Sequence, residues 1–191
     1  MSTTAPRVEP ALLDVPVSGY RLRPGSFRDQ LDPGGTLVVF LRHLGCIFCR
    51  ECVSDLAADR VRESLPPVLF VHPAGVAEGN AFFAKFDPAA RGISDPECRF
   101  YEGFGIGRGG LGQLFGPSVI VCGFRATRKG NGIGKMQGDP WRMPGFVLVR
   151  DGEIVWEHTV RHAGDHPDFD RLPEELAAIA GSDRDIAATL G

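Results

Sequence analysis

Continuous apolar runs alternate with amphipathic segments through the first half of the chain. Residues 36–41 and 67–71 are runs of β-branched, aromatic and other apolar residues, which are typical of strands buried on both faces of a sheet. Residues 48–62 repeat apolar residues at helical spacing and place charges on the other face, and residues 79–86 predict another helix. This strand–helix alternation predicts neighbouring parallel strands with helices packed on the sheet.

The second half of the chain predicts a hairpin and a closing helix. Residues 146–149 and 154–158 flank Asp151-Gly152, and an Asp-Gly pair between two such runs is a strong hairpin signal. Residues 169–180 are amphipathic. The sequence therefore predicts an α/β fold with a mixed central sheet, helices on both faces and a late β-hairpin. Further expected features are short helices at 98–104, 117–129 and 182–190, a glycine-rich stretch of undefined fold at 103–116, and a loop at 130–138.

Composition narrows the class of protein. The chain has 191 residues, of which 43% are hydrophobic, so it can form one domain with a real core. We expect an N-terminal arm at residues 1–20 and a domain at residues 21–191. The formal net charge of −3 argues against a nucleic-acid partner. Because the first residues contain no long apolar run, we expect no signal peptide, no membrane span and a cytoplasmic location.

The sequence Cys46-Ile47-Phe48-Cys49 is the strongest candidate for chemistry. It lies where a buried strand is predicted to end and an amphipathic helix to begin. A helix N-terminus and the auxiliary charges of Arg42 and Arg50 favour thiolate over thiol. We therefore expect Cys46, at an exposed position, to attack a substrate, and Cys49 to resolve the resulting mixed disulfide or sulfenic acid.

The remaining cysteines and the histidines leave a metal-binding alternative open. Cys52 follows Cys49 by three residues and can act as an auxiliary thiol or a third ligand, although a small buried residue is the simpler interpretation. Cys98 and Cys122 resemble buried single cysteines. His158, His162 and His166 are spaced by four, but Gly164 and Pro167 argue against a helix there. We therefore predict no metal and no cofactor.

Two glycine patterns are rejected as nucleotide sites. Gly105, Gly107 and Gly110 satisfy G-x-G-x-x-G, but no clear strand precedes them and no acidic residue follows at the expected distance. Gly134-Lys135 lacks the other residues of a phosphate-binding loop.

Four segments resemble a known family. Residues 36–50, with their Leu-Arg-His-Leu-Gly-Cys-Ile-Phe-Cys-Arg core, are similar to the peroxiredoxin-like branch of the AhpC/TSA antioxidant group, which includes selenoprotein-L-like and peroxiredoxin-like 2 proteins. Residues 94–105, 138–147 and 161–167 agree with other parts of that family. The resemblance spans roughly residues 21–176 and is most specific in its first segment.

The resemblance implies a thioredoxin-like fold and a cysteine-based redox site. It also implies that Pro144 is the cis-proline that faces the cysteine pair, which would keep the backbone of Met143 available to an extended substrate. The expected partners are a disulfide or peroxide substrate and a thiol electron donor, and the sequence is compatible with a homodimer.

One departure from the family bears on activity. Peroxiredoxins carry Pro-x-x-x-Thr-x-x-Cys at the peroxidatic cysteine, and neither Cys46 nor Cys49 is preceded by that pattern. We therefore predict a thiol–disulfide oxidoreductase that cycles Cys46 and Cys49 between dithiol and disulfide. The alternatives are a thiol-dependent peroxidase, and a non-catalytic redox sensor or metal-binding module with the same fold.

Overall fold

The computed structural model describes residues 7–128, 139 and 141–179. The loop expected at 130–138, the Gly134-Lys135 pair and the helix expected at 182–190 lie outside the described residues. The strands are β1 (Gly19–Tyr20), β2 (Thr36–Phe40), β3 (Val68–His72), β4 (Gly92–Ser94), β5 (Gly145–Arg150) and β6 (Glu153–Glu157). The helices are α1 (Pro10–Leu13), α2 (Phe27–Gln30), α3 (Ile47–Ala57), α4 (Asp59–Arg62), α5 (Val76–Phe86), α6 (Arg99–Gly103), α7 (Leu111–Phe115), α8 (Pro117–Arg128) and a last helix at 172–179.

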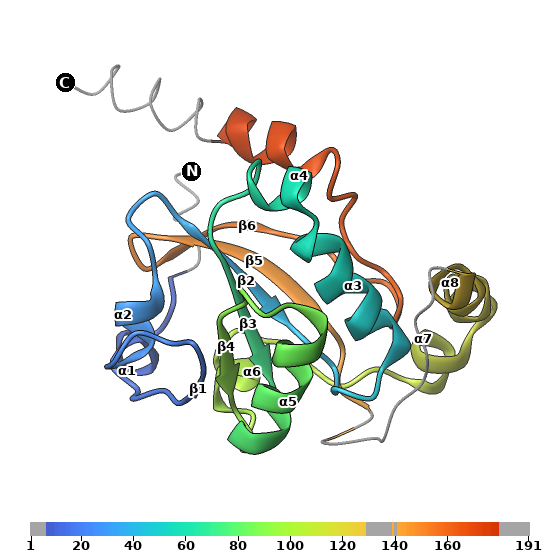
Figure 1. The fold of residues 1–191 in the computed structure, drawn as a ribbon, viewed down its shortest axis with the longest axis horizontal. Helices are drawn as coiled ribbons and strands as arrows, with labels where there is room; N and C mark the ends of the chain where they lie inside the picture. Colours follow the sequence, from blue (N-terminus) through green and yellow to red (C-terminus); the bar gives the residue numbers. More distant parts are fainter. Residues whose placement is uncertain (1–6, 129–138, 140, 180–191) are drawn as a thin grey trace, which may run out of the picture.

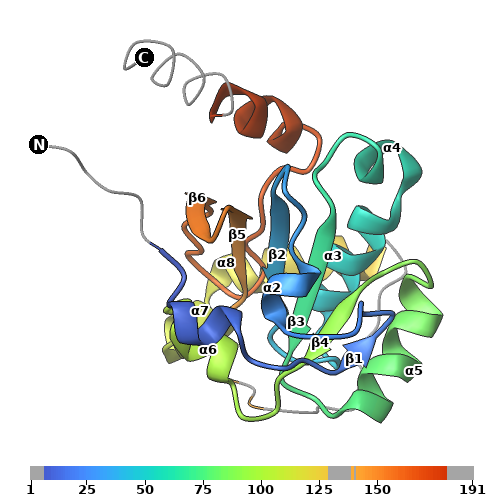
Figure 2. The same cartoon turned by 90° about the vertical axis from the view of Figure 1, so that its left-hand side faces the viewer.

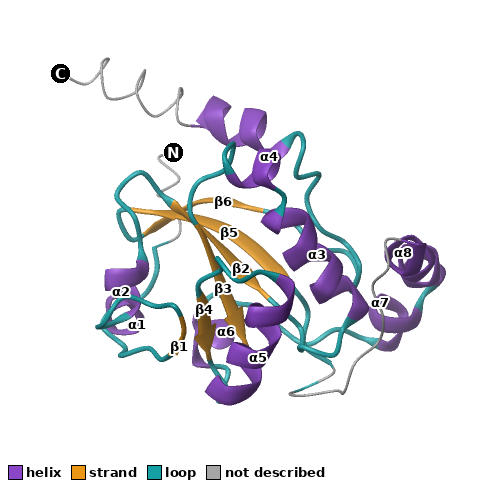
Figure 3. Ribbon diagram, viewed as in Figure 1, coloured by secondary structure: helices purple, strands orange, loops and turns teal. Residues whose placement is uncertain are grey.

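The strands form one mixed sheet in the order β1-β4-β3-β2-β5-β6 (Figures 1 and 3). Strand β3 runs parallel to both β2 and β4, whereas β5 is antiparallel to β2 and β6. The predicted hairpin is confirmed. Its turn residues Asp151 and Gly152 have φ angles of 51° and 76°, the two positive values that a tight hairpin turn matching the strand twist requires.

Helices cover both faces of the sheet, as predicted. Alternate residues of the central strands point to opposite sides, so Leu37 and Val39 join one apolar cluster and Val38 and Phe40 the other. The first cluster contains side chains of α3, α5 and the helix at 172–179. The second contains side chains of α1, α2 and α6. Figure 2 shows α3, α4 and α5 on one side of the sheet and α6 on the other.

The described part of the expected arm packs on the sheet. Leu12 and Leu13 of α1 are buried in the second cluster, and β1 pairs with β4 at the sheet edge. The helix expected at 48–62 is interrupted at Ala58, whose ψ of 128° is extended, so that α3 and α4 are separate. Within the described residues, every helix is too short or too polar to cross a membrane.

Candidate active site

Cys46 occupies the N-terminal cap of α3, and residues 41–45 connect it to the C-terminal end of β2. Its φ and ψ of −71° and 127° are extended, and its carbonyl accepts the first helical hydrogen bond from the Arg50 N–H at 3.1 Å. The preceding turn is closed by the Cys46 N–H, which donates to the His43 carbonyl at 3.0 Å. The sulfur of Cys46 therefore lies at the positive end of an eleven-residue helix, as predicted.

The two sulfur atoms are brought together and held by Arg42. The side chains of Cys46 and Cys49 are hydrogen-bonded to each other. The Arg42 backbone N–H lies 3.2 Å from the Cys49 sulfur, and the Arg42 Nη1 lies 3.5 Å from the Cys46 sulfur. Arg42 Nε also donates to the Arg142 carbonyl at 2.8 Å. One residue thus contacts both cysteines and the segment that precedes Pro144.

The pKa values of the two thiols move in opposite directions. The pKa of Cys46 is lowered from 9.0 to about 6, mainly by the hydrogen bond with Cys49, against burial and with help from Arg42 and the backbone at Cys49 and Phe48. The pKa of Cys49 is raised well above its ordinary value, by burial and then by the hydrogen bond and the charge at Cys46. At neutral pH the pair therefore holds one nucleophilic thiolate and one proton-carrying thiol.

Both cysteines are buried, and the expectation of an exposed Cys46 is wrong. Cys46 is 5% exposed and Cys49 is 4% exposed, because both belong to the apolar cluster between α3 and the sheet. Beside Cys49 lies a cavity of about 10 Å³ that Cys52, Pro144 and Gly164 also line. That volume holds about one water molecule. This cavity is therefore too small to admit a substrate to the Cys49 sulfur.

Pro144 lies beside the cysteines, but the prediction of a cis bond is wrong. The described residues contain no cis peptide bond, so Met143–Pro144 is trans. The Met143 N–H is not available to a substrate either, since it donates to the Gly107 carbonyl at 3.1 Å. A second bond joins the Gly109 N–H to the Trp141 carbonyl. The glycine-rich stretch thus pairs with the segment before Pro144, and this pairing occupies the backbone that the prediction had left open.

The auxiliary residues have different surroundings. The Arg50 guanidinium lies over the Phe86 ring, 5.2 Å from its centroid. His43 is neutral at pH 7, because burial and then the charges of Arg42 and Arg50 lower its pKa to about 4. Cys52 is buried beside the same small cavity as Cys49, and burial, followed by the charges of Asp55, Glu51 and Cys46, raises its pKa well above 9.0. Cys52 thus has the character of a protonated, packed thiol.

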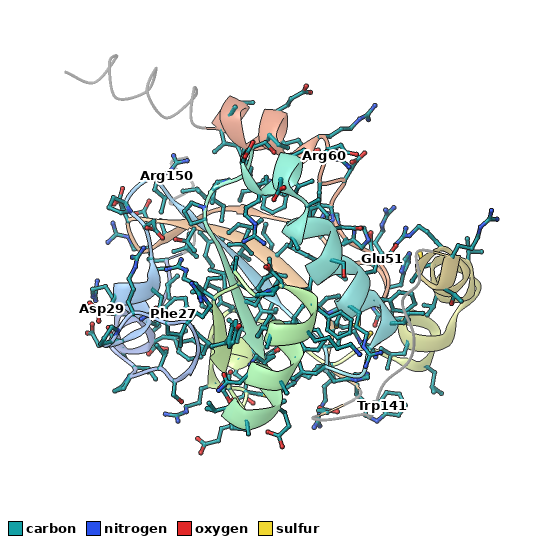
Figure 4. The ribbon with its side chains drawn as sticks, in the orientation of Figure 1. Phe27, Asp29, Glu51, Arg60, Trp141 and Arg150 are labelled. Carbon is teal, nitrogen blue, oxygen red and sulfur yellow. The ribbon has the colours of Figure 1, made fainter. Side chains whose placement is uncertain are left out.

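The structure separates the possible metal ligands from the cysteines. Among the described residues, the ligand atoms that gather closely belong to Glu51, Asp55 and His166, and the group includes no cysteine. Arg125 already binds Glu51 through two hydrogen bonds of 2.9 and 3.0 Å. Figure 4 shows Glu51 on the side of α3 that faces α8. A larger cavity of about 420 Å³ lies next to this cluster, between the α3–α4 junction and residues 166–170, and neither Cys46 nor Cys49 lines it.

Sequence reasoning missed two contributors to the site. Arg142 is 9% exposed, and its guanidinium lies 5.5 Å from the centroid of the Tyr101 ring while Nη1 donates to the Ile106 carbonyl. The Glu51–Arg125 pair joins α3 to α8 across 74 residues of sequence. The only available signal was the position of Arg142 two residues before Pro144. Glu51 and Arg125 carry no motif.

The fold and this geometry define a protein of the thioredoxin-fold class with two adjacent cysteines at a helix N-terminus. In sequence, the chain is similar to a peroxiredoxin-like protein. The chain is 25% identical over 170 residues to Peroxiredoxin-like 2C of Bos taurus. The matched region covers 80% of this chain and 71% of the relative. No protein-family model matches the chain.

Solved structures show the same fold. A cysteine-to-serine mutant of peroxiredoxin Q from Xanthomonas campestris has a TM-score of 0.60 and 15% identity, covering 93% of this chain and 98% of that one. A peroxiredoxin Q mutant from Xylella fastidiosa has a TM-score of 0.58 and 15% identity, and the match covers 94% of this chain and 98% of that one. A secreted Mycobacterium tuberculosis disulfide oxidoreductase homologous to DsbE has a TM-score of 0.52 and 16% identity, and the match covers 89% of this chain and 99% of that one.

Proposed function

We propose that the protein is a thiol–disulfide oxidoreductase in which Cys46 is the attacking cysteine and Cys49 the resolving one. The observation that carries this proposal is the place of Cys46 at the N-terminal cap of α3, where Arg42 contacts the sulfur atoms of both Cys46 and Cys49. The Cys46 thiolate attacks a substrate disulfide, a new sulfur–sulfur bond forms at Cys46, and one substrate sulfur leaves as thiolate. Cys49 then loses its proton and attacks the Cys46 sulfur, which closes the Cys46–Cys49 disulfide and releases the second substrate thiolate.

An external thiol donor completes the cycle. Two electrons from that donor return the Cys46–Cys49 disulfide to the dithiol, so the proposal requires a second partner besides the substrate. The cytoplasmic location predicted from the sequence, where such donors keep thiols reduced, remains part of this proposal.

The cysteine roles are tested by substitution. Cys46→Ser is expected to abolish the reduction of insulin disulfides, since the nucleophile is lost. Cys49→Ser is expected to accumulate a mixed disulfide at Cys46, which mass spectrometry detects, since resolution is lost. Cys122→Ser is the control, because Cys122 lies on α8 and outside the cysteine pair. A Cys46→Ser protein with normal turnover would refute the proposal.

A thiol-dependent peroxidase is the second candidate, favoured by the similarity to Peroxiredoxin-like 2C. The Cys46 thiolate would attack the terminal oxygen of a hydroperoxide, giving Cys46 sulfenic acid and an alcohol or water. Cys49 would then form the disulfide and release water. The Arg42 guanidinium, 3.5 Å from the Cys46 sulfur, supplies a hydrogen-bond donor where the family threonine is missing. Peroxide consumption that exceeds insulin reduction would favour this candidate, whereas stoichiometric zinc binding without turnover would favour a metal-binding module.

A further inference from the structure

Arg42 is placed so that it responds to the redox state of the cysteine pair. It is 7% exposed. Its backbone N–H contacts the Cys49 sulfur, its Nη1 contacts the Cys46 sulfur, and its Nε is fixed by the Arg142 carbonyl. Because the guanidinium is planar, the hydrogen bond from Nε to the Arg142 carbonyl, 100 residues away in sequence, keeps the Nη1 group directed at Cys46.

The contact between Arg42 and the Cys46 sulfur is stronger in the reduced protein. A thiolate carries a full negative charge, and charge-assisted hydrogen bonds are about twice as strong as neutral ones. A disulfide sulfur is neutral and a weak acceptor. Oxidation therefore removes the negative charge that faces the Arg42 guanidinium, and it does so at a site where burial makes charge interactions strong.

We propose that Arg42 is the positioning residue that raises the reduction potential of the Cys46–Cys49 disulfide, so that the pair readily accepts electrons from its thiol donor. The inference rests on the proposed function and concerns the half of its cycle in which the disulfide is reduced. A donor thiolate attacks Cys46, the Cys46–Cys49 bond breaks, and Cys49 leaves and takes a proton. The second donor thiolate then attacks the donor sulfur of the mixed disulfide, which forms the donor disulfide and releases Cys46 as thiolate. Arg42 stabilises this leaving group, and a stabilised thiolate leaves faster.

The equilibrium with glutathione measures this directly. Wild type, Arg42→Gln and Arg42→Lys are equilibrated at pH 7 in buffers of defined glutathione ratio, and the dithiol fraction is read by alkylation and mass spectrometry. Arg42→Gln is expected to shift the equilibrium at least about tenfold toward the disulfide, which corresponds to a potential lower by about 30 mV. Arg42→Lys keeps the charge but loses the planar fork, so it should lie between the two.

Arg60→Gln is the matched control. Arg60 is a 72% exposed side chain that pairs with Asp170, and Figure 4 places it beside the last helix, away from the N-terminus of α3. Arg60→Gln should leave the glutathione equilibrium of the cysteine pair within about twofold of the wild-type value. An Arg42→Gln equilibrium equal to that of wild type overturns the inference.

A measurement on the wild type keeps the inference testable if Arg42→Gln does not fold. Disulfides ordinarily stabilise proteins by constraining the unfolded chain. The inference predicts the reverse here: the reduced protein unfolds at a higher temperature than the oxidised protein at pH 7. A more stable oxidised form contradicts it. If the Cys46–Cys49 disulfide forms but Arg42→Gln leaves its equilibrium with glutathione unchanged, this inference alone fails. If no Cys46–Cys49 disulfide forms in any buffer, the proposed function fails as well.

Discussion

At the scale of single residues, the chemistry depends on an asymmetry between two identical side chains. Cys46 is at the helix cap and receives hydrogen bonds, whereas Cys49 lies one turn in and is surrounded by apolar groups. The pKa of Cys46 is lowered to about 6, and that of Cys49 is raised by burial. The hydrogen bond between the two side chains therefore favours the thiolate at Cys46, and burial favours the protonated thiol at Cys49.

The thiolate at Cys46 predicts a pH profile. Its folded pKa of about 6 is below the ordinary value of 9.0, so the stability it contributes is fully present above pH 9 and is lost as the pH falls through 6. Thiolate absorbance near 240 nm, measured on the reduced protein from pH 4 to pH 8 with Cys46→Ser subtracted, should rise with a midpoint near 6. A midpoint near 9 would show that the cap does not activate the sulfur.

The ion pair between the buried Glu51 of α3 and the half-exposed Arg125 of α8 is expected to matter for stability. Glu51 has no exposed surface, and Arg125 donates two hydrogen bonds to it. Arg125→Met leaves the carboxylate without these bonds and should lower the free energy of unfolding by about 2–3 kcal/mol, as measured by urea denaturation. Glu51→Gln combined with Arg125→Met removes the buried charge and should recover part of the loss. Equal stability of Arg125→Met and wild type would contradict this interpretation.

At the scale of elements, the loop at 161–167 approaches α3 and α8 closely at one glycine. A Cβ added to Gly164 would lie 2.8 Å from the Cys122 Cβ and 3.1 Å from the Phe48 ring. Gly164→Ala should therefore cost about 1–3 kcal/mol through overpacking, and loosen the wall of the cavity beside Cys49. Gly112→Ala is the control, because no atom lies within 4 Å of the added Cβ and alanine favours the helix. Thermal unfolding of both variants decides the point, and a Gly164→Ala protein as stable as Gly112→Ala would refute the close contact.

Element patterns explain what the sequence could predict. The long apolar run at 36–41 and the Asp-Gly turn are sufficient to predict β2 and the hairpin. A strand buried on both faces requires apolar residues throughout, and a turn with positive φ angles favours Asp and Gly. Strands β1 and β4 have only two and three residues, too few to show a period. The glycine-rich stretch contains α7 and pairs with residues 141–143, which depends on contacts distant in sequence.

The same reasoning applies to the site. The Cys-x-x-Cys spacing and its place before a helix predicted that the two sulfurs lie close together and at the N-terminal end of the helix. Their burial and the trans bond at Pro144 could not be predicted. The burial depends on the apolar cluster between α3 and the sheet, and residues 141–143 pair with the glycine-rich stretch, which is distant in sequence. The role of Arg42 as a bridge to Arg142 likewise depends on a tertiary contact.

At the scale of the whole molecule, the N-terminal segment forms part of the second apolar cluster. Leu12 and Leu13 are 8% and 6% exposed, and Leu12 packs against Gly103 of α6. Leu12→Ala and Leu13→Ala should each lower the free energy of unfolding by about 2–4 kcal/mol in chemical denaturation. Val121→Ala is the control, because Val121 is 70% exposed. Losses no larger than that of the control would indicate an arm that is independent of the domain.

In the proposed mechanism, Cys46 and Cys49 form one redox pair. Trypsin cleavage after Arg42 and Arg50 places both cysteines in the peptide 43–50 and leaves Cys52 in the next peptide. After mild oxidation and alkylation, mass spectrometry should find an internal disulfide in peptide 43–50, with Cys52, Cys98 and Cys122 alkylated. A peptide 43–50 that is fully alkylated, or that is linked to any of the other three cysteines, would contradict the account.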